Sequence, residues 1–283
     1  MSSLRDRLTA PAPIVFAPTG MVPTRETTPH VPLTPEEIAR DVADAWSVGI
    51  TSVHLHARDE DGRPTWRADV YRRIVGAVRD RVPEVLINVS TSGRDWSELE
   101  RRAEVLGLDG DAKPDFASMT PSSLNFIRQA SLNAPDVVRG LCRIMLERDI
   151  VPEFEIFDLG MLNVMQRLET EGLAPRPHLV NLFFGNIAGL QATAGEVGIA
   201  VDRLTADAVW SGAGLGAYQA TAHMLSAAAG GGLRVGIEDA TALHASSDPA
   251  TNVQLVEQAH RILDVLARPV MSPAEMRARL VRA

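Results

Sequence analysis

Eight short apolar runs alternate with stretches of helical periodicity along this 283-residue chain, and this alternation constrains its fold. Two intervals begin with a helix-start signature, Thr34-Pro35-Glu36-Glu37 and Ser272-Pro273-Ala274-Glu275, in which a hydroxyl side chain can cap a helix that has proline at its first position. Strands and helices alternating in this number over about 250 residues are typical of a (β/α)8 TIM barrel, an α/β fold. The expected strands cover residues 14–19, 52–57, 85–90, 116–120, 151–157, 179–184, 208–213 and 233–239.

One domain is predicted for residues 1–283, because no linker rich in Gly, Pro or Ser and no block of like charge divides the chain. Residues 1–13 are expected to be a short N-terminal lead, and residues 272–283 a C-terminal helix. The lone cysteine, Cys142, cannot form an intrachain disulfide and is expected to be a small core residue.

Charge and residue usage exclude several kinds of partner and chemistry. The formal net charge of −8 argues against a nucleic-acid partner. No apolar run approaches the roughly 20 residues of a membrane span, and residues 1–13 contain no apolar signal core, so a cytoplasmic enzyme acting on small molecules is expected, with no membrane partner. Lys113 is the only lysine and falls in a polar loop, which excludes a Schiff-base aldolase and a Gly-Lys-Ser/Thr phosphate loop.

The triplet His54-Leu55-His56 is the strongest chemical signal. It lies in an expected strand, where alternate side chains point to the same face, so both imidazoles are expected to reach one point. Glu238, near the end of the last expected strand, is the third candidate ligand. Two histidines and a carboxylate are a catalytic zinc set, and also the facial set of iron(II) oxygenases. The alternatives are two buried structural histidines, and a helix cap formed by Glu238 and Asp239.

Further polar side chains stand at the ends of other expected strands, where a TIM barrel places its catalytic groups. Glu153 and Glu155 share one face of the fifth strand by its period of two. Ser90 and Ser118 could instead be strand-end caps, and Glu155 could be an ion-pair partner of Arg234. The remaining candidates are Thr120, Arg234 and Asp239. Five histidines lie away from strand ends and are expected to be structural or at the surface: His30, His178, His223, His244 and His260.

These residues belong to a set of motifs by which the chain resembles the β-keto acid cleavage enzymes over most of its length. No single motif is specific, but their combination and order are. The matching motifs are Ala17-Pro18-Thr19-Gly20 with Thr24-Arg25, Leu33-Thr34-Pro35-Glu36-Glu37-Ile38-Ala39, His54-Leu55-His56-Ala57-Arg58-Asp59-Glu60-Asp61-Gly62-Arg63-Pro64, Asn88-Val89-Ser90-Thr91, Lys113-Pro114-Asp115, Leu124-Asn125-Phe126, Pro152-Glu153-Phe154-Glu155 and Arg234-Val235-Gly236-Ile237-Glu238-Asp239.

The resemblance implies a barrel that holds Zn2+ through His54, His56 and Glu238. It implies that Asp239 is the base and acts with Arg234 and Glu155. Ser90 and Ser118 would hold the carboxylate of the substrate, with Ser118 in place of the usual threonine. The implied reaction is retro-Claisen chemistry, in which a β-keto acid and acetyl-CoA give acetoacetate and a new acyl-CoA. A homo-oligomer is also implied.

Four positions depart from the resemblance: Val22, Thr120, Ala217 and Ala240. Val22 stands where the name-giving family member has a glutamate available to a cationic substrate amine, so an uncharged substrate tail is expected here, because a buried cation needs a compensating carboxylate.

Two other interpretations stay open at this stage. One is a zinc amidohydrolase-like hydrolase, although that family needs further histidines on the fifth and sixth strands, where the expected strands have none. The other is a catalytically impaired metal-binding barrel, which the altered substrate pocket allows.

Overall fold

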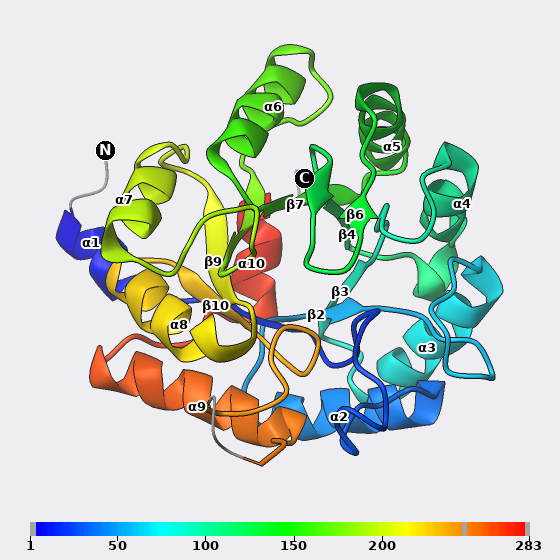
Figure 1. Ribbon diagram of the computed structural model, residues 1–283, viewed down its shortest axis with the longest axis horizontal. Coiled ribbons are helices and arrows are strands. Elements are labelled where there is room, and N and C mark those ends of the chain that lie inside the picture. The colour runs from blue at the N-terminus through cyan, green and yellow to red at the C-terminus, as the bar shows by residue number, and fades with distance from the viewer. Residues whose placement is uncertain (1–3, 245–247, 281–283) are drawn as a thin grey trace.

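The computed structural model describes residues 4–244 and 248–280, and eight parallel strands in it close into a barrel surrounded by helices (Figure 1). The TIM barrel expected from the sequence is therefore confirmed. The strands in barrel order are β1 (Ile14–Phe16), β10 (Gly232–Val235), β9 (Val209–Gly214), β8 (Leu179–Phe184), β7 (Val151–Ile156), β4 (Phe116–Met119), β3 (Leu86–Val89) and β2 (Ser52–Leu55).

Helices fill the intervals between the strands. The α-helices are α1 (Leu4–Thr9), α2 (Pro35–Val48), α3 (Ala68–Arg81), α4 (Leu99–Ala103), α5 (Pro135–Glu147), α6 (Leu159–Thr170), α7 (Ala194–Asp202), α8 (Gln219–Ala228), α9 (Asn252–Val265) and α10 (Pro273–Leu280), and the 3-10 turns are η1 (Glu104–Gly107), η2 (Gly110–Ala112) and η3 (Gly216–Tyr218). A small antiparallel hairpin that was not expected, β5 (Leu124–Asn125) with β6 (Ala130–Ser131), lies in the segment after β4.

Both predicted helix-start signatures form reciprocal caps. At the start of α2 the Glu37 N–H donates to Thr34 Oγ1 at 3.2 Å, and the Thr34 N–H donates to the Glu37 carboxylate at 3.1 Å. Ser272 and Glu275 make the same exchange at the start of α10. Each cap satisfies backbone donors that the first helical turn leaves free, which is why the sequence marked these two boundaries well.

A separate apolar cluster closes the N-terminal end of the barrel. Side chains from the first residues of four strands pack there against Met271 and against Met276 and Leu280 of α10, which in projection lies within the ring of outer helices (Figure 1). The lead expected for residues 1–13 contains α1 and then joins this end, because the Ala12 N–H donates to Pro269 O at 2.8 Å. Because this end is filled, the barrel is open only at the C-terminal ends of its strands.

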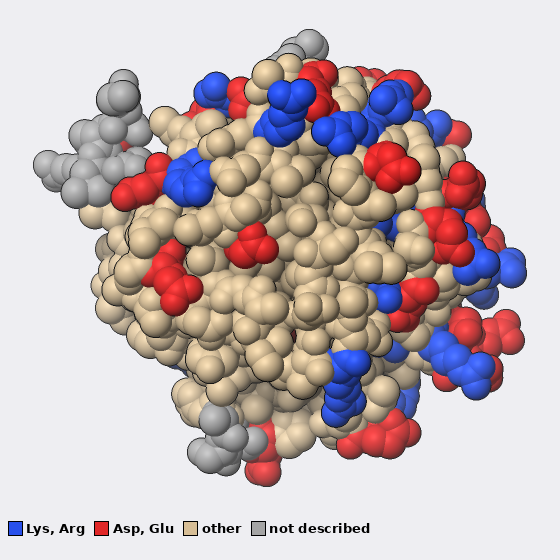
Figure 2. Space-filling model, turned by 45° about the horizontal axis from the view of Figure 1, so that its top comes forward, with Lys and Arg blue, Asp and Glu red and all other residues tan. Residues whose placement is uncertain are grey.

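Acidic and basic side chains are intermingled around the rim of the face in Figure 2, and its central area is mostly uncharged. No helix in the described part of the chain is long and apolar enough to cross a membrane.

Gly236 is expected to be indispensable for the junction between β10 and β1. A Cβ atom there would lie 2.0 Å from Ala17 O, and the residue has a φ of 152°. We expect Gly236→Ala to lower the free energy of unfolding by about 1–3 kcal/mol or more, because backbone must move to relieve the clash. Chemical denaturation of the purified variant measures this.

The matched control is Gly76→Ala in α3, where a Cβ would meet no atom within 4 Å. Because alanine favours a helix interior, this change should raise stability by up to about 1 kcal/mol. Equal stabilities for the two variants would contradict the role assigned to Gly236.

Candidate metal centre and active site

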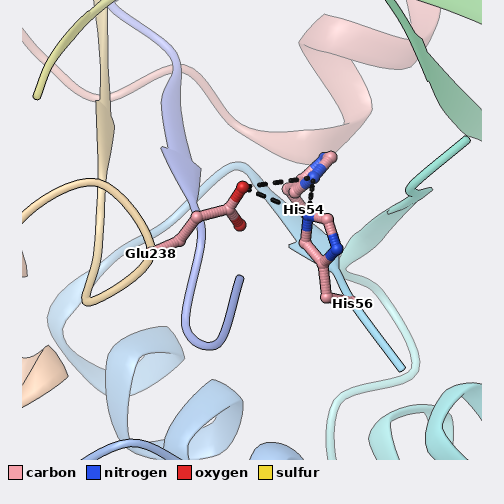
Figure 3. A group of neighbouring side chains, drawn as sticks. All are labelled: His54, His56 and Glu238. Atoms are coloured by element: carbon pink, nitrogen blue, oxygen red, sulfur yellow. Dashed lines mark hydrogen bonds and ion pairs between the residues drawn. The ribbon is translucent and has the colours of Figure 1, made fainter. Parts of the chain in front are cut away.

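Three potential ligand atoms converge at the C-terminal end of the barrel (Figure 3). His54 lies on β2 and His56 just beyond its end, and their Nε2 atoms are 3.1 Å apart. Glu238 Oε1, from the segment after β10, lies 3.1 Å from His56 Nε2 and 3.8 Å from His54 Nε2. Only β1 separates β10 from β2 in the barrel, which is why residues 182 positions apart in sequence meet here.

The donor set fits a divalent metal ion. Two facing neutral imidazole nitrogens can share only one proton, and the carboxylate adds a third atom with a free lone pair, so hydrogen bonding alone satisfies this triangle poorly. Burial, with the nearby charge of Arg234, lowers the pKa of His54 to about 3, which keeps its ring in the neutral form that binds metals. The set of two histidines and one glutamate belongs to the catalytic zinc class.

Glu238 reaches this position because Gly20 leaves room for it. Gly20 has a φ of 65°, and a Cβ atom there would lie 2.6 Å from Glu238 Cγ. The Glu238 N–H also donates to Ala17 O at 3.2 Å. The Ala17-Pro18-Thr19-Gly20 motif therefore positions the carboxylate of Glu238.

Arg234 is fully buried on β10, and its guanidinium contacts the carboxylates of three acidic residues of the site. Its Nε donates to Asp239 Oδ2 at 3.0 Å and its Nη2 to Glu238 Oε1 at 2.8 Å, while Nη1 lies 3.8 Å from Glu155 Oε1. Burial opposes the charge of Arg234, but the surrounding carboxylates raise its pKa above the usual value. Burial by itself would raise the pKa of the Glu238 carboxyl. The neighbouring His56 and Arg234 outweigh this effect and lower that pKa well below its usual range.

Asp239 shares this site with Glu238 because the expected strand ends early. A strand over residues 233–239 would point these neighbours to opposite faces, but β10 ends at Val235, so that predicted boundary is wrong. The N–H groups of Asp239 and Ala240 both donate to Gly236 O at 3.1 Å, and this turn lets both carboxylates reach Arg234. Burial raises the pKa of Asp239 to about 7; Arg234 opposes the rise and the charge of Glu238 adds to it.

A cavity that is open to solvent lies beside the carboxylates. Glu155 projects into it from β7 and accepts a hydrogen bond from Thr120 Oγ1 at 2.9 Å. Val22 lies at its rim with 57% of its surface exposed, and Ser90 also lines it. The structure thus brings most of the sequence-predicted site residues to one cavity. Its lining is Met21, Val22, His56, Ser90, Ser92, Arg94, Thr120, Phe126, Ser131, Glu155, Phe157, Phe183, Leu215, Glu238 and Asp239.

Three predicted site residues do not line this cavity: His54 and Arg234, which lie buried beside it, and Ser118. Ser118 is the one of the three that makes none of the contacts of the metal centre or the arginine cluster described above. It is buried on β4, where its Oγ accepts the Thr91 N–H at 3.2 Å, and Thr91 Oγ1 donates to Ser118 O at 2.6 Å. These bonds join the ends of β3 and β4. The geometry agrees with the alternative interpretation of Ser118 as a strand-end cap.

Glu153 was not assigned a role from the sequence, although its spacing from Glu155 placed both on one face. It lies fully buried beneath the candidate metal ligands, with Oε2 3.7 Å from His54 Nδ1, and it accepts a hydrogen bond from Asn88. Burial raises the pKa of Glu153 to about 7. A carboxylate behind a ligating histidine commonly orients the ring, so the spacing Glu153-x-Glu155 opposite His54-x-His56 could have indicated this contact.

Arg58 is a second residue that sequence reasoning missed, although it stands in the motif that follows the histidine pair. Its buried guanidinium donates to the backbone carbonyls of Gly20, at 2.6 and 3.0 Å, and of Pro23 and Gly62. It therefore holds the segment after β1, on which the placement of Glu238 depends.

Three of the histidines expected to be structural are confirmed as such. Each ring bonds to a backbone carbonyl: His178 to Ala174, His223 to Arg234 and His260 to Gly49.

The fold and the site define a TIM-barrel enzyme with a candidate metal centre beside a buried arginine–carboxylate cluster. The chain matches the family model of the beta-keto acid cleavage enzyme over residues 11–281, and it belongs to this family. The resemblance drawn from the sequence is thereby confirmed, and the amidohydrolase-like alternative is wrong.

Two curated relatives are similar over nearly their whole lengths. The 3-keto-5-aminohexanoate cleavage enzyme of Fusobacterium nucleatum is 31% identical over 268 residues, covering 93% of this chain and 95% of the relative. The 3-oxoadipate:acetyl-CoA acetyltransferase of Cupriavidus necator is 32% identical over 276 residues, covering 96% and 95%. Among solved structures, apo ObcA superposes with a TM-score of 0.78 at 21% identity; the match covers 89% of this chain and 65% of that one, and supports the fold.

We expect the purified protein to bind one divalent metal ion per chain, and His56→Ala to lose it, because the variant removes one of three converging ligand atoms. Elemental analysis after dialysis against metal-free buffer gives the metal-to-protein ratio. His30→Ala, at an exposed position that belongs to neither candidate ligand group and lines neither cavity at the site, is the matched control and should keep the ion. Wild-type stoichiometry in His56→Ala would contradict the assignment.

Proposed function

We propose that this enzyme cleaves a β-keto acid with acetyl-CoA, giving acetoacetate and a new acyl-CoA. The observation that carries the proposal is the cluster in which Arg234 holds Asp239 and Glu238 beside the converging histidines. Family membership, and the acetyl-CoA-dependent reaction in the name of the Cupriavidus relative, support the same chemistry.

We further propose that the metal is zinc, held by His54, His56 and Glu238. The donor set fits zinc, and the reaction needs no change of oxidation state. When bound, zinc supplies Lewis acidity that polarises the keto oxygen of the substrate. An iron-loaded site in fully active protein would contradict this choice.

Asp239 is the proposed base. Its carboxylate takes a proton from C2 of the β-keto acid, and a pKa of about 7, raised mainly by burial, suits a group that must both accept and return a proton near neutral pH. Arg234 holds Asp239 in place and its charge offsets the negative charge that develops on the substrate. Glu155, held by Thr120, fixes the other side of the guanidinium.

The bonds exchanged in the reaction balance without an oxidant or reductant. The C2 carbanion attacks the thioester carbonyl of acetyl-CoA and forms a new C–C bond. The coenzyme A thiolate then transfers to the original keto carbon, and the bond between C2 and that carbon breaks. The C2 fragment, now carrying the acetyl group, leaves as acetoacetate after Asp239 returns the proton, and the tail leaves as its acyl-CoA.

Two adjoining cavities suit a reaction of two substrates. A second cavity, lined in part by Trp66, Trp96 and Arg101, shares several lining residues with the cavity beside the carboxylates. The shared residues are Met21, His56, Ser90 and Ser92. Both cavities therefore reach the candidate metal centre, and we assign the one beside the carboxylates to the keto acid and the tryptophan-lined one to the thioester.

The test is turnover of a panel of β-keto acids by the zinc-loaded protein with acetyl-CoA, with acetoacetate and acyl-CoA measured by mass spectrometry. We expect Asp239→Asn to keep its zinc but to lose about 10²-fold or more in kcat, because the amide cannot accept the C2 proton.

The control for a general loss of structure is zinc content measured on the same sample. Near-normal turnover by Asp239→Asn with a full metal site would move the role of base to Glu155. The absence of any turnover by the wild-type protein would favour the catalytically impaired barrel.

Val22 at the cavity rim is expected to disfavour substrates with a cationic tail, because it offers no carboxylate to offset a desolvated ammonium group. Val22→Glu should shift the ratio of kcat/KM between an ammonium-bearing and an alkyl β-keto acid of equal length toward the ammonium compound. Val265→Glu, at the last residue of α9 with 86% of its surface exposed, is the matched control and should leave the ratio unchanged. A wild-type preference for the ammonium compound would contradict the assignment.

A further inference from the structure

Arg94 is a cation of the keto acid cavity that has no counterion among the described residues. It lines the cavity together with Glu155, Glu238 and Asp239, yet none of the ion pairs between described residues includes it. Its Nε is buried and has no hydrogen-bond partner in the described part of the chain. A buried donor with a full charge is costly unless a partner meets it, so this arginine is a candidate for binding an anionic ligand.

The guanidinium of Arg94 is held in place by contacts that leave its N–H groups free. Its Cζ lies 3.9 Å from the ring centroid of Phe126, which follows β5 in the small hairpin. The backbone of Arg94 is tied to the same region, since its N–H donates to Ser92 Oγ at 3.3 Å and its carbonyl accepts from Gln129 Nε2 at 3.4 Å. A cation stacked on an aromatic face keeps its donor edges for a carboxylate.

A row of aromatic rings connects Arg94 with Arg234. The rings of Phe126 and Phe157 meet edge to face at 5.5 Å, and Phe157 stacks on Phe183 at 4.4 Å. Arg234 lies over the far ring, with Cζ 4.9 Å from the Phe183 centroid. All three rings line the cavity. One wall of the cavity is therefore apolar. Arg94 lines the cavity at one end of this row, and Arg234, which does not itself line the cavity, lies over the ring at the other end.

The charge at the two ends differs. Arg234 already contacts three carboxylates, and a divalent ion held by the histidines and Glu238 would balance the remaining negative charge there. Arg94 adds one positive charge beyond that balance. The carboxylate of the β-keto acid is attached to C2, which must reach Asp239, so this carboxylate belongs to the Arg234 end of the wall.

We propose that Arg94 binds a second anionic group at the far end of the substrate tail, so that the preferred substrate is a β-keto dicarboxylic acid. Its methylene groups lie along the phenylalanine row. The proposal rests on the cleavage reaction proposed above and replaces the uncharged tail expected from Val22 alone. Val22 and Arg94 act in the same direction against a cationic tail, since one offers no carboxylate and the other repels an ammonium group.

The test compares two six-carbon acids that differ only at the tail, 3-oxoadipate and 3-oxohexanoate. The wild-type enzyme should prefer 3-oxoadipate in kcat/KM. Arg94→Gln should lose about 10- to 100-fold on 3-oxoadipate, the range expected for a charged hydrogen bond, and change little on 3-oxohexanoate. Arg94→Lys should retain part of the preference. Arg63→Gln, at an exposed position beyond β2, is the matched control and should leave the ratio unchanged.

An equal loss on both acids in Arg94→Gln would overturn the proposal, because Arg94 would then bind the shared carboxylate or coenzyme A. A wild-type preference for 3-oxohexanoate would also overturn it. Calorimetric binding of the two acids to the zinc-loaded protein gives a readout that does not require turnover. If neither acid is cleaved, the proposed reaction fails, while tighter binding of 3-oxoadipate that is lost in Arg94→Gln still supports the role of Arg94 and equal affinities refute it.

Discussion

The site depends on one buried guanidinium. Arg234 lies inside the barrel, where a cation without partners would be strongly destabilising, and Asp239, Glu238 and Glu155 surround it. The dependence is mutual, because three carboxylates this close together would repel one another without the cation between them. This arrangement positions a candidate metal ligand and the proposed base with a single side chain, and it explains why one arginine stands in a strand whose other residues are apolar or glycine.

The backbone around Arg234 is as constrained as its charge. β10 ends one residue after the arginine, and Gly236 then passes so close to Ala17 that no side chain fits. The resulting turn points Glu238 and Asp239 toward the same guanidinium, and Gly20 leaves the space that Glu238 occupies. Two glycines, one in each of the segments that follow the neighbouring strands β1 and β10, thus determine where the acidic groups stand relative to His54 and His56.

The chemistry proposed for the enzyme follows from where the barrel is open. α10 and its apolar neighbours fill the N-terminal end, so the reacting groups stand at the other end, where two cavities meet at His56. One cavity has an aromatic row with an arginine at each end, so its two ends differ. The candidate metal centre and the proposed base lie at one end, and at the other lies Arg94, which has no counterion among the described residues. A long substrate with different groups at its ends can bind such a cavity in one orientation.

The sequence by itself determined the barrel, the boundaries of α2 and α10, and the three candidate metal ligands. Strand alternation, capping boxes and the His-x-His spacing are local patterns, and they depend on interactions between residues a few positions apart. The position of Asp239 could not be predicted in this way, because it depends on a turn made necessary by the contact of Gly236 with a different strand. The place of Ser118 in a hydrogen-bonded strand end, of Glu153 beneath His54, and of Arg94 beside the phenylalanine row was likewise decided only by the tertiary structure. In each case a side chain meets a partner from another strand or loop, and the closure of the barrel alone brings these distant segments together.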